Sequence, residues 1–160
     1  MKELKVNHYD VVLLKAVDGD TVDVDIDLGF GVWLRNERVR IMGIDTPESR
    51  TSDKVEKLFG KAAKYRLKEL LTEGGVLVTT EEKSGEDMRG KFGRILGDFK
   101  TPDGKLVTEV MIEEGHCVPY FGGSKDDVQA QHMINRERLL NEGVVSREDY
   151  DKAIKLMESK

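Results

Sequence analysis

The chain of 160 residues is long enough to bury the core of one domain. Its 31 acidic and 26 basic side chains give a formal net charge of −5, which argues against a general nucleic-acid binder, because such proteins carry a basic footprint. No apolar run approaches the length of a membrane span, and the single Cys117 excludes an internal disulfide.

The first ten residues contain charges but lack the apolar segment of a secretory signal. We therefore expect a cytoplasmic protein, and secretion after processing stays open. No repeat, low-complexity tract or Pro/Ser-rich linker divides the chain. We expect a monomer with one domain over residues 1–145, and residues 146–160 form a C-terminal helical extension of that domain.

Three segments joined by short turns predict a β-meander in the first third of the chain. The second of them, after the Asp18-Gly19-Asp20 turn, alternates strictly between apolar and polar side chains, which is typical of a half-buried strand. Two further short strands follow later. The five predicted strands are residues 9–17, 21–28, 32–44, 76–80 and 93–99.

Apolar residues at helical spacing predict a long helix, and Ser146 followed by Asp149 resembles a capping box for the last one. The predicted helices are about residues 53–71, 107–114, 126–141 and 147–159. Together these elements predict an α+β fold: a small closed five-stranded barrel, about three helices packed against it, and a C-terminal helix.

Charged side chains gather at the ends of three predicted strands. They belong to the motifs at residues 18–21 (DGDT), 40–48 (RIMGIDTPE) and 91–94 (KFGR). Each motif alone also fits ordinary structure, as a turn, a helix start or a paired arginine. In combination they supply what phosphodiester hydrolysis needs: hard oxygen ligands for a divalent cation, guanidinium forks for phosphate, and a carboxylate for water.

No zinc site is expected, because His8, His116 and His132 share no ligand spacing. We expect these histidines at the surface or on helices. Nor do Asp23, Asp25 and Asp27 match a calcium-binding EF-hand loop, since apolar residues stand between them. They are interpreted as a solvated strand face.

The segments VDGDTV (17–22), VRIMGIDTPE (39–48), KFGR (91–94) and VTEVMIEEG (107–115), in this order, resemble the staphylococcal nuclease-like (thermonuclease) family. The resemblance covers about residues 9–145. It implies an OB-fold barrel of five strands with three helices. It also implies a calcium-dependent nuclease that breaks the bond between the 5′-oxygen and phosphorus of DNA or RNA, leaves 3′-phosphate ends and favours single-stranded substrate.

The resemblance further implies roles for individual residues. Asp20, Asp45 and the backbone carbonyl of Thr46 would coordinate Ca²⁺. Arg40 and Arg94 would bind the scissile phosphate, and Arg94 would also stabilise the transition state. The sixth residue of this set, Glu48, would act as general base or orient the attacking water.

Substrate contacts are implied for Lys91, Phe92 and Tyr120. The family has a tyrosine where this chain has Phe92, and its archetype is basic whereas this chain is acidic. These departures leave the implied catalytic set complete. They bear on substrate affinity and on the choice between DNA and RNA.

Two other interpretations remain open. One is a catalytically inactive nuclease-like OB-fold module that binds single-stranded nucleic acid or a protein partner, although such modules usually lose part of the charged set. The other is a single-strand binder that acts by base stacking, which the 6% aromatic content does not favour. A lysine-rich face of the helix at residues 53–71 is either solvated or a secondary nucleic-acid patch.

Overall fold

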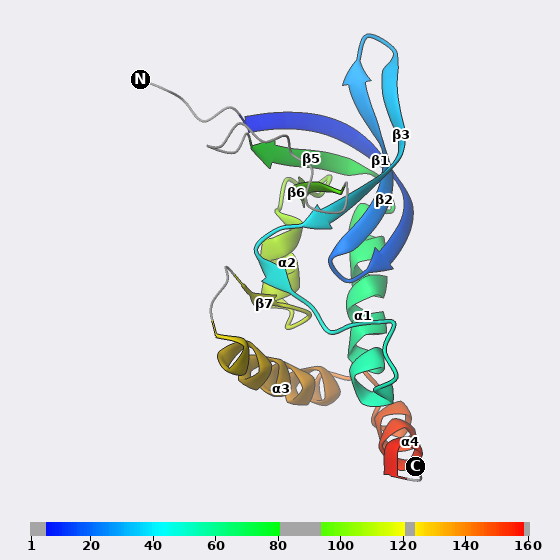
Figure 1. The fold of residues 1–160 in the computed structure, drawn as a ribbon, viewed down its shortest axis with the longest axis vertical. Helices are drawn as coiled ribbons and strands as arrows, with labels where there is room; N and C mark the ends of the chain where they lie inside the picture. Colours follow the sequence, from blue (N-terminus) through cyan, green and yellow to red (C-terminus); the bar gives the residue numbers. More distant parts are fainter. Residues whose placement is uncertain (1–5, 81–93, 121–123, 159–160) are drawn as a thin grey trace.

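Residues 6–80, 94–120 and 124–158 are described by a computed structural model, in which five strands close into a barrel (Figure 1). The barrel strands are β1 (Val6–Asp18), β2 (Thr21–Gly29), β3 (Val32–Ile41), β5 (Gly75–Thr80) and β6 (Ile95–Lys100). Around the barrel they follow the order β1-β2-β3-β6-β5. Only β3 and β6 run parallel. The predicted five-stranded OB-type barrel is confirmed.

Strict alternation in β2 explains how the barrel fills. Val22, Val24 and Ile26 are at most 2% exposed and point into the core. The aspartates of β2 lie on the other face, but the predicted solvated face is wrong for Asp23, which is only 9% exposed, and arginines of β3 pair with two of these aspartates. Arg38 donates to both carboxylate oxygens of Asp23, at 2.8 and 3.1 Å, and Arg35 pairs with Asp25 at 3.0 Å. The outer face of β2 is therefore largely charge-neutralised.

The predicted continuous strand over residues 32–44 is wrong. β3 ends at Ile41, and Gly43 takes a left-handed conformation with φ +79° that a β-strand does not accommodate. A separate short strand, β4 (Ile44–Asp45), then pairs with β7 (Val118–Pro119) in a two-stranded sheet that the sequence did not predict. The break carries the residues after Gly43 out of the barrel wall.

The four predicted helices are confirmed. They are α1 (Lys54–Leu71), α2 (Val107–Glu113), α3 (Lys125–Asn141) and α4 (Arg147–Glu158). Asp53 caps α1, because its carboxylate accepts from the backbone N–H groups of Val55 and Glu56. No helix in the described ranges is long and apolar enough to cross a membrane.

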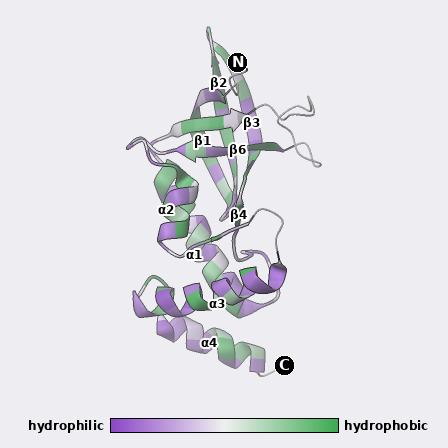
Figure 2. Ribbon diagram, turned by 90° about the vertical axis from the view of Figure 1, so that its left-hand side faces the viewer, coloured by the Kyte–Doolittle hydropathy of each residue, from purple (hydrophilic) through white to green (hydrophobic). Residues whose placement is uncertain are grey.

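Two apolar clusters lie at opposite ends of α1. Ala63 and Leu67, in its second half, pack into the barrel core, whereas Val55 and Phe59, in its first half, pack with residues of α3 and α4. Figures 1 and 2 show the resulting shape: the barrel at one end, α3 and α4 at the other, and α1 spanning both. We call α3 and α4 the helical layer. The loop after β4 therefore lies between the barrel and the helical layer.

Candidate active site

An open cavity of about 510 Å³ lies where the barrel meets the loop that follows β4. Two short motifs and the residue directly before β6, far apart in the sequence, contribute to its lining. Six of the predicted site residues line it: Asp20, Arg40, Asp45, Thr46, Glu48 and Arg94. The structure therefore brings together the charged groups that sequence analysis assigned to metal, phosphate and water.

The corner between β1 and β2 places Asp20 at the mouth of the barrel. Gly19 is required at this corner, because a Cβ there would lie 2.7 Å from the Cβ of Ala63 on α1 and 3.3 Å from that of Thr46. The backbone carbonyl of Asp20 also accepts from the N–H of Ile41 at 2.7 Å. These contacts fix the corner against α1 and the end of β3.

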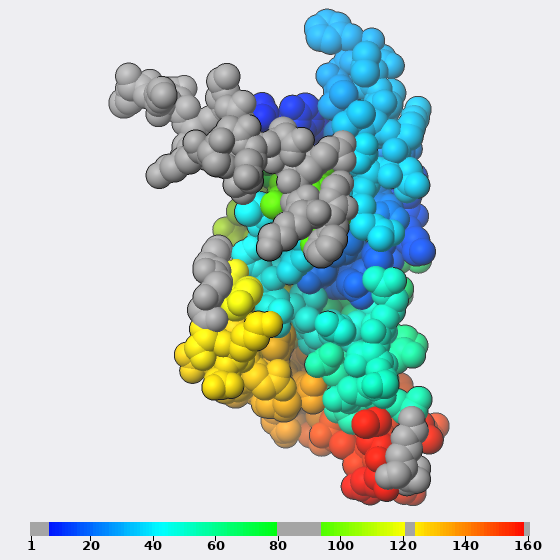
Figure 3. All heavy atoms as spheres, viewed as in Figure 1, coloured from blue at the N-terminus to red at the C-terminus, as the bar shows by residue number. Residues whose placement is uncertain are grey.

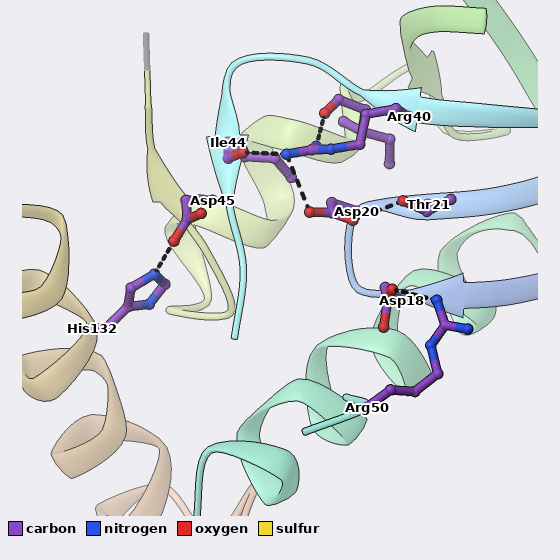
Figure 4. A network of polar contacts seen from close by, with 9 residues as sticks. Asp18, Asp20, Thr21, Arg40, Ile44, Asp45, Arg50 and His132 are labelled. Atoms are coloured by element: carbon purple, nitrogen blue, oxygen red, sulfur yellow. Dashed lines mark hydrogen bonds and ion pairs between the residues drawn. The ribbon is translucent and has the colours of Figure 1, made fainter. Parts of the chain in front are cut away.

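Arg40, near the end of β3, is held by three acceptors (Figure 4). Its guanidinium donates to the backbone carbonyls of Ile41 and Ile44, the latter at 3.2 Å, and pairs with Asp20 Oδ2 at 3.2 Å. The other oxygen of Asp20 accepts from the Thr21 hydroxyl at 2.8 Å. The Arg40 side chain remains 25% exposed at the cavity. Its guanidinium has five N–H donors, so some of them remain available to a ligand in the cavity.

The side chain of Asp45, on β4, contacts a histidine of the helical layer. Its Oδ2 lies 2.7 Å from Nε2 of His132 on α3, and the His132 side chain is only 8% exposed (Figure 4). Sequence analysis missed this partner and grouped His132 with surface or helix histidines. The residue is on a helix, but it is buried. No local signal connects it with a residue 87 positions away.

Asp18 and Arg50 form a further ion pair at the edge of the cavity that sequence analysis did not single out. Arg50 Nη2 lies 3.3 Å from Asp18 Oδ2, and the Ser49 hydroxyl donates to the other oxygen. Both Asp18 and Arg50 line the cavity. The signal available was their sequence position, since each lies two residues from a predicted site residue.

Glu48 is exposed at the cavity, and no side-chain hydrogen bond joins its carboxylate to another described residue. Its backbone is fixed by α1: a Cβ on Gly60 would lie 2.3 Å from the Glu48 carbonyl oxygen, so only glycine admits this approach. Glu48 thus combines a fixed backbone with a carboxylate whose lone pairs remain available to water.

The other predicted positions lie differently. The backbone N–H of Tyr120 donates to the carbonyl of Gly43 at 2.9 Å, and Tyr120 does not line the cavity. Its substrate contact stays a prediction. Lys91 and Phe92 lie outside the described residues. His116 is neither exposed nor helical: it is 4% exposed in the segment after α2, so the expectation for it is wrong.

Cys117 is buried, as expected of a small core side chain. Burial raises the pKa of its thiol to about 12, and the carboxylates of Asp20, Asp98 and Asp45 add to this effect. The thiol therefore stays protonated at neutral pH. It supplies neither a nucleophile nor a thiolate ligand to the nearby cavity.

The donors along the cavity fit a hard divalent cation. Asp20, Asp45 and the Thr46 carbonyl offer oxygen ligands, and a carboxylate has about four lone-pair positions. The described contacts use two of these on Asp20 and one on Asp45. Within the described part of the chain no three histidine, cysteine or acidic side chains form a cluster that could hold a metal ion by themselves.

Comparison with known proteins identifies the family of the chain. The sequence profile of the family described as staphylococcal nuclease homologue matches residues 38–148, more than half of the chain. The chain belongs to this family. The matched region contains every charged cavity residue named above except Asp18 and Asp20, which precede it.

Several proteins that are similar to this chain carry nuclease names. The SPbeta prophage-derived endonuclease YokF of Bacillus subtilis is 35% identical over 106 residues, which are 66% of this chain and 32% of the relative. Endonuclease YncB of the same organism is 34% identical over 105 residues, 66% and 45% of the two chains. The thermonuclease of Staphylococcus intermedius is 33% identical over 130 residues, 78% and 71%. The chain thus spans less than half the length of the two Bacillus relatives.

Proposed function

We propose that this chain is a calcium-dependent nuclease that hydrolyses phosphodiester bonds of DNA or RNA, with single strands favoured, and leaves 3′-phosphate ends. The observation that carries the proposal is the convergence of Asp20, Arg40, Asp45, Glu48 and Arg94 on one open cavity. Endonuclease and thermonuclease names among the relatives support the same reaction class.

The arginines bind the substrate in this mechanism. Arg40, near the end of β3, and Arg94, directly before β6, both line the cavity, so a phosphate bound there could receive donors from both side chains. Planar guanidinium groups bind phosphate bidentately and stabilise the charge that develops as the phosphorus becomes pentacoordinate. Arg40 needs little reorganisation, because three acceptors already fix it.

Glu48 handles the proton of the attacking water. Its carboxylate accepts a proton as the water oxygen forms a bond to phosphorus, and the bond between phosphorus and the 5′-oxygen breaks. The 5′-oxygen leaves and takes a proton from solvent, which produces a 3′-phosphate and a 5′-hydroxyl. Asp20, Asp45 and the Thr46 carbonyl would hold calcium, which when bound polarises the phosphoryl oxygen.

The test is cleavage of end-labelled single-stranded DNA and RNA with calcium, with magnesium and with chelator. We expect calcium-dependent cleavage that leaves 3′-phosphate ends. Glu48→Gln should keep the shape of the side chain and lose about 10²–10⁴-fold in rate, because it removes a general base. Cleavage by this variant at the parent rate would show that Glu48 is not the base.

Absence of cleavage by the folded protein under every metal condition would overturn the proposal. Salt-sensitive binding of nucleic acid in chelator, combined with that absence, would then support the inactive OB-fold module described above. Circular dichroism of each protein, measured in the assay buffer, separates loss of activity from loss of fold.

A further inference from the structure

Five lysines follow one another along α1 at intervals of three and four residues, so that they form a line on one face of the helix. We call this line the lysine stripe, and it consists of Lys54, Lys57, Lys61, Lys64 and Lys68. At 1.5 Å per residue it is about 21 Å long. Figure 3 shows part of α1 as blue-green atoms that reach the surface between the blue barrel strands and the red α4.

The lysine stripe passes directly beside the cavity loop. Lys57 and Lys64 stand three residues before and four residues after Gly60, so the three share one side of the helix. Gly60 is the position against which the backbone of Glu48 and Ser49 packs. The middle of the stripe therefore flanks the segment that carries the proposed general base.

No lysine of the stripe forms an ion pair with another described residue, although the chain has a net charge of −5. Neighbours three and four apart repel when their charges match, and Lys54 and Lys57 also lie at the helix end where the backbone dipole disfavours cations. The charges of Lys54 and Lys57 are therefore unfavourable at their end of the helix, whereas Lys68 lies in the last turn, where the dipole favours a cation.

Two exposed side chains extend this surface. Arg50, whose side chain is 71% exposed, lines the cavity and stands four residues before the first lysine of the stripe. Tyr65 is 64% exposed and lies four residues after Lys61 and three before Lys68. A basic track with an exposed aromatic ring is the combination by which proteins bind the backbone and stack the bases of a single strand.

We propose that the lysine stripe binds the phosphate backbone of the nucleic-acid strand whose scissile phosphate occupies the cavity. This inference rests on the proposed function and names the route of the substrate outside the active site. Charge complementarity and continuity with the cavity through Arg50 both support a polyanion as the occupant. Along one strand of a B-form duplex, about 21 Å corresponds to about six phosphates.

The binding test uses a fluorescein-labelled single-stranded 20-residue oligonucleotide in chelator, so that no cleavage occurs, with salt varied from about 50 to about 200 mM. The variant is Lys57→Gln/Lys61→Gln/Lys64→Gln. The slope of log affinity against log salt should fall by about 2, because each phosphate contact contributes about 0.7. Over this range the parent should therefore lose about 20-fold more affinity than the variant.

A matched control separates local binding from net charge. Lys15→Gln/Lys105→Gln/Lys125→Gln removes the same charge from exposed positions outside α1 and α4, and its slope should equal that of the parent. Equal slopes for all three proteins, or equal reductions in both variants, would overturn the proposal and leave the stripe as a solvated helix face.

Turnover distinguishes this inference from the proposed function. With calcium, the stripe variant should cleave a dinucleotide with unchanged kcat/KM, while its KM for the long strand rises about tenfold through lost phosphate contacts. An equal loss on both substrates would contradict a role outside the cavity. If the parent cleaves neither substrate, the proposed function fails, and the salt slopes still decide whether the stripe binds the strand.

Discussion

The two sides of the cavity are built differently. On the barrel side, Arg40 stands on β3 and Asp20 lies in the turn between β1 and β2, and hydrogen bonds with neighbouring backbone groups fix both residues. On the helical side, Asp45 lies on a strand of two residues, and its carboxylate contacts His132 on a helix that packs in the other apolar cluster. Local structure therefore positions one half of the site, and the packing of α3 positions the other.

This difference determines what the sequence can predict. Alternation of Val22, Val24 and Ile26 with aspartates predicts both a strand and the face that carries charge, because strand geometry is local. The end of β3 at Ile41 was not predicted, since an apolar, arginine-rich run continues beyond it and a single glycine reverses the backbone. Cavity residues on the barrel side were found from their motifs because those motifs are themselves turns and strand ends.

On the helical side the relevant information is not local. The contact between His132 and Asp45 exists because α3 packs against β7, which pairs with β4, and no spacing in the sequence encodes that approach. The ion pair between Arg50 and Asp18 likewise depends on how the loop after β4 folds back to the corner between β1 and β2. Both contacts follow from tertiary packing. Single-sequence periodicity does not report such packing.

The largest expected effect tests whether the two apolar clusters unfold together. Phe59 is 1% exposed, its ring meets Tyr150 of α4 at 6.3 Å, and Arg136 lies 5.3 Å above it. Phe59→Ala should lower the free energy of unfolding by about 3–5 kcal/mol. Because α1 belongs to both clusters, urea unfolding followed by Trp33 fluorescence and by far-ultraviolet circular dichroism should still coincide. Separate transitions would mean that the helical layer unfolds independently of the barrel.

Next in size is the barrel half of the site. Arg40→Lys replaces a fork held by three acceptors with a point charge, and kcat should fall by about 10²–10³-fold in the cleavage assay. The control is Arg38→Lys, two residues earlier on the same strand, whose guanidinium forks onto Asp23 on the outer face. Its activity should match the parent. Equal losses in both variants would point to damage to β3 and not to the lost guanidinium.

On the helical side of the cavity, a substitution at His132 should have a smaller effect, which is a loss of calcium affinity. His132→Ala removes the hydrogen bond that orients Asp45, and outer partners of metal ligands are typically worth about 10–100-fold in affinity. Calcium titration calorimetry measures it, and His132→Gln, which keeps a donor, should recover part of the loss. Met133→Ala, at the exposed neighbouring position, is the control. Unchanged affinity in His132→Ala would show that Asp45 needs no support from α3.

The smallest expected effect is on the pH dependence of stability, and it concerns His116, which lies near Arg138 and Glu142 at the end of α3. Burial lowers the pKa of His116 below its ordinary value of 6.5, so the unfolded chain binds the proton more tightly than the folded one. The contribution of neutral His116 to the free energy of unfolding is therefore fully present above about pH 6.5. Below that pH the free energy of unfolding falls by at most about 1.4 kcal/mol per pH unit, because one proton is involved. His116→Leu should flatten this dependence in urea titrations between pH 5 and 7. An identical pH dependence in the variant would assign it to other groups.

The central claim is that one cation site is shared by the two sides of the cavity, and calorimetric titration with calcium tests it most directly. The parent should bind one ion at this site. Asp20→Asn from the barrel and Asp45→Asn from the helical side should each weaken the same binding event by tenfold or more, about 1.4 kcal/mol. Unchanged affinity in either variant, with the fold intact, would show that the two carboxylates do not hold one ion and would contradict this account of the site.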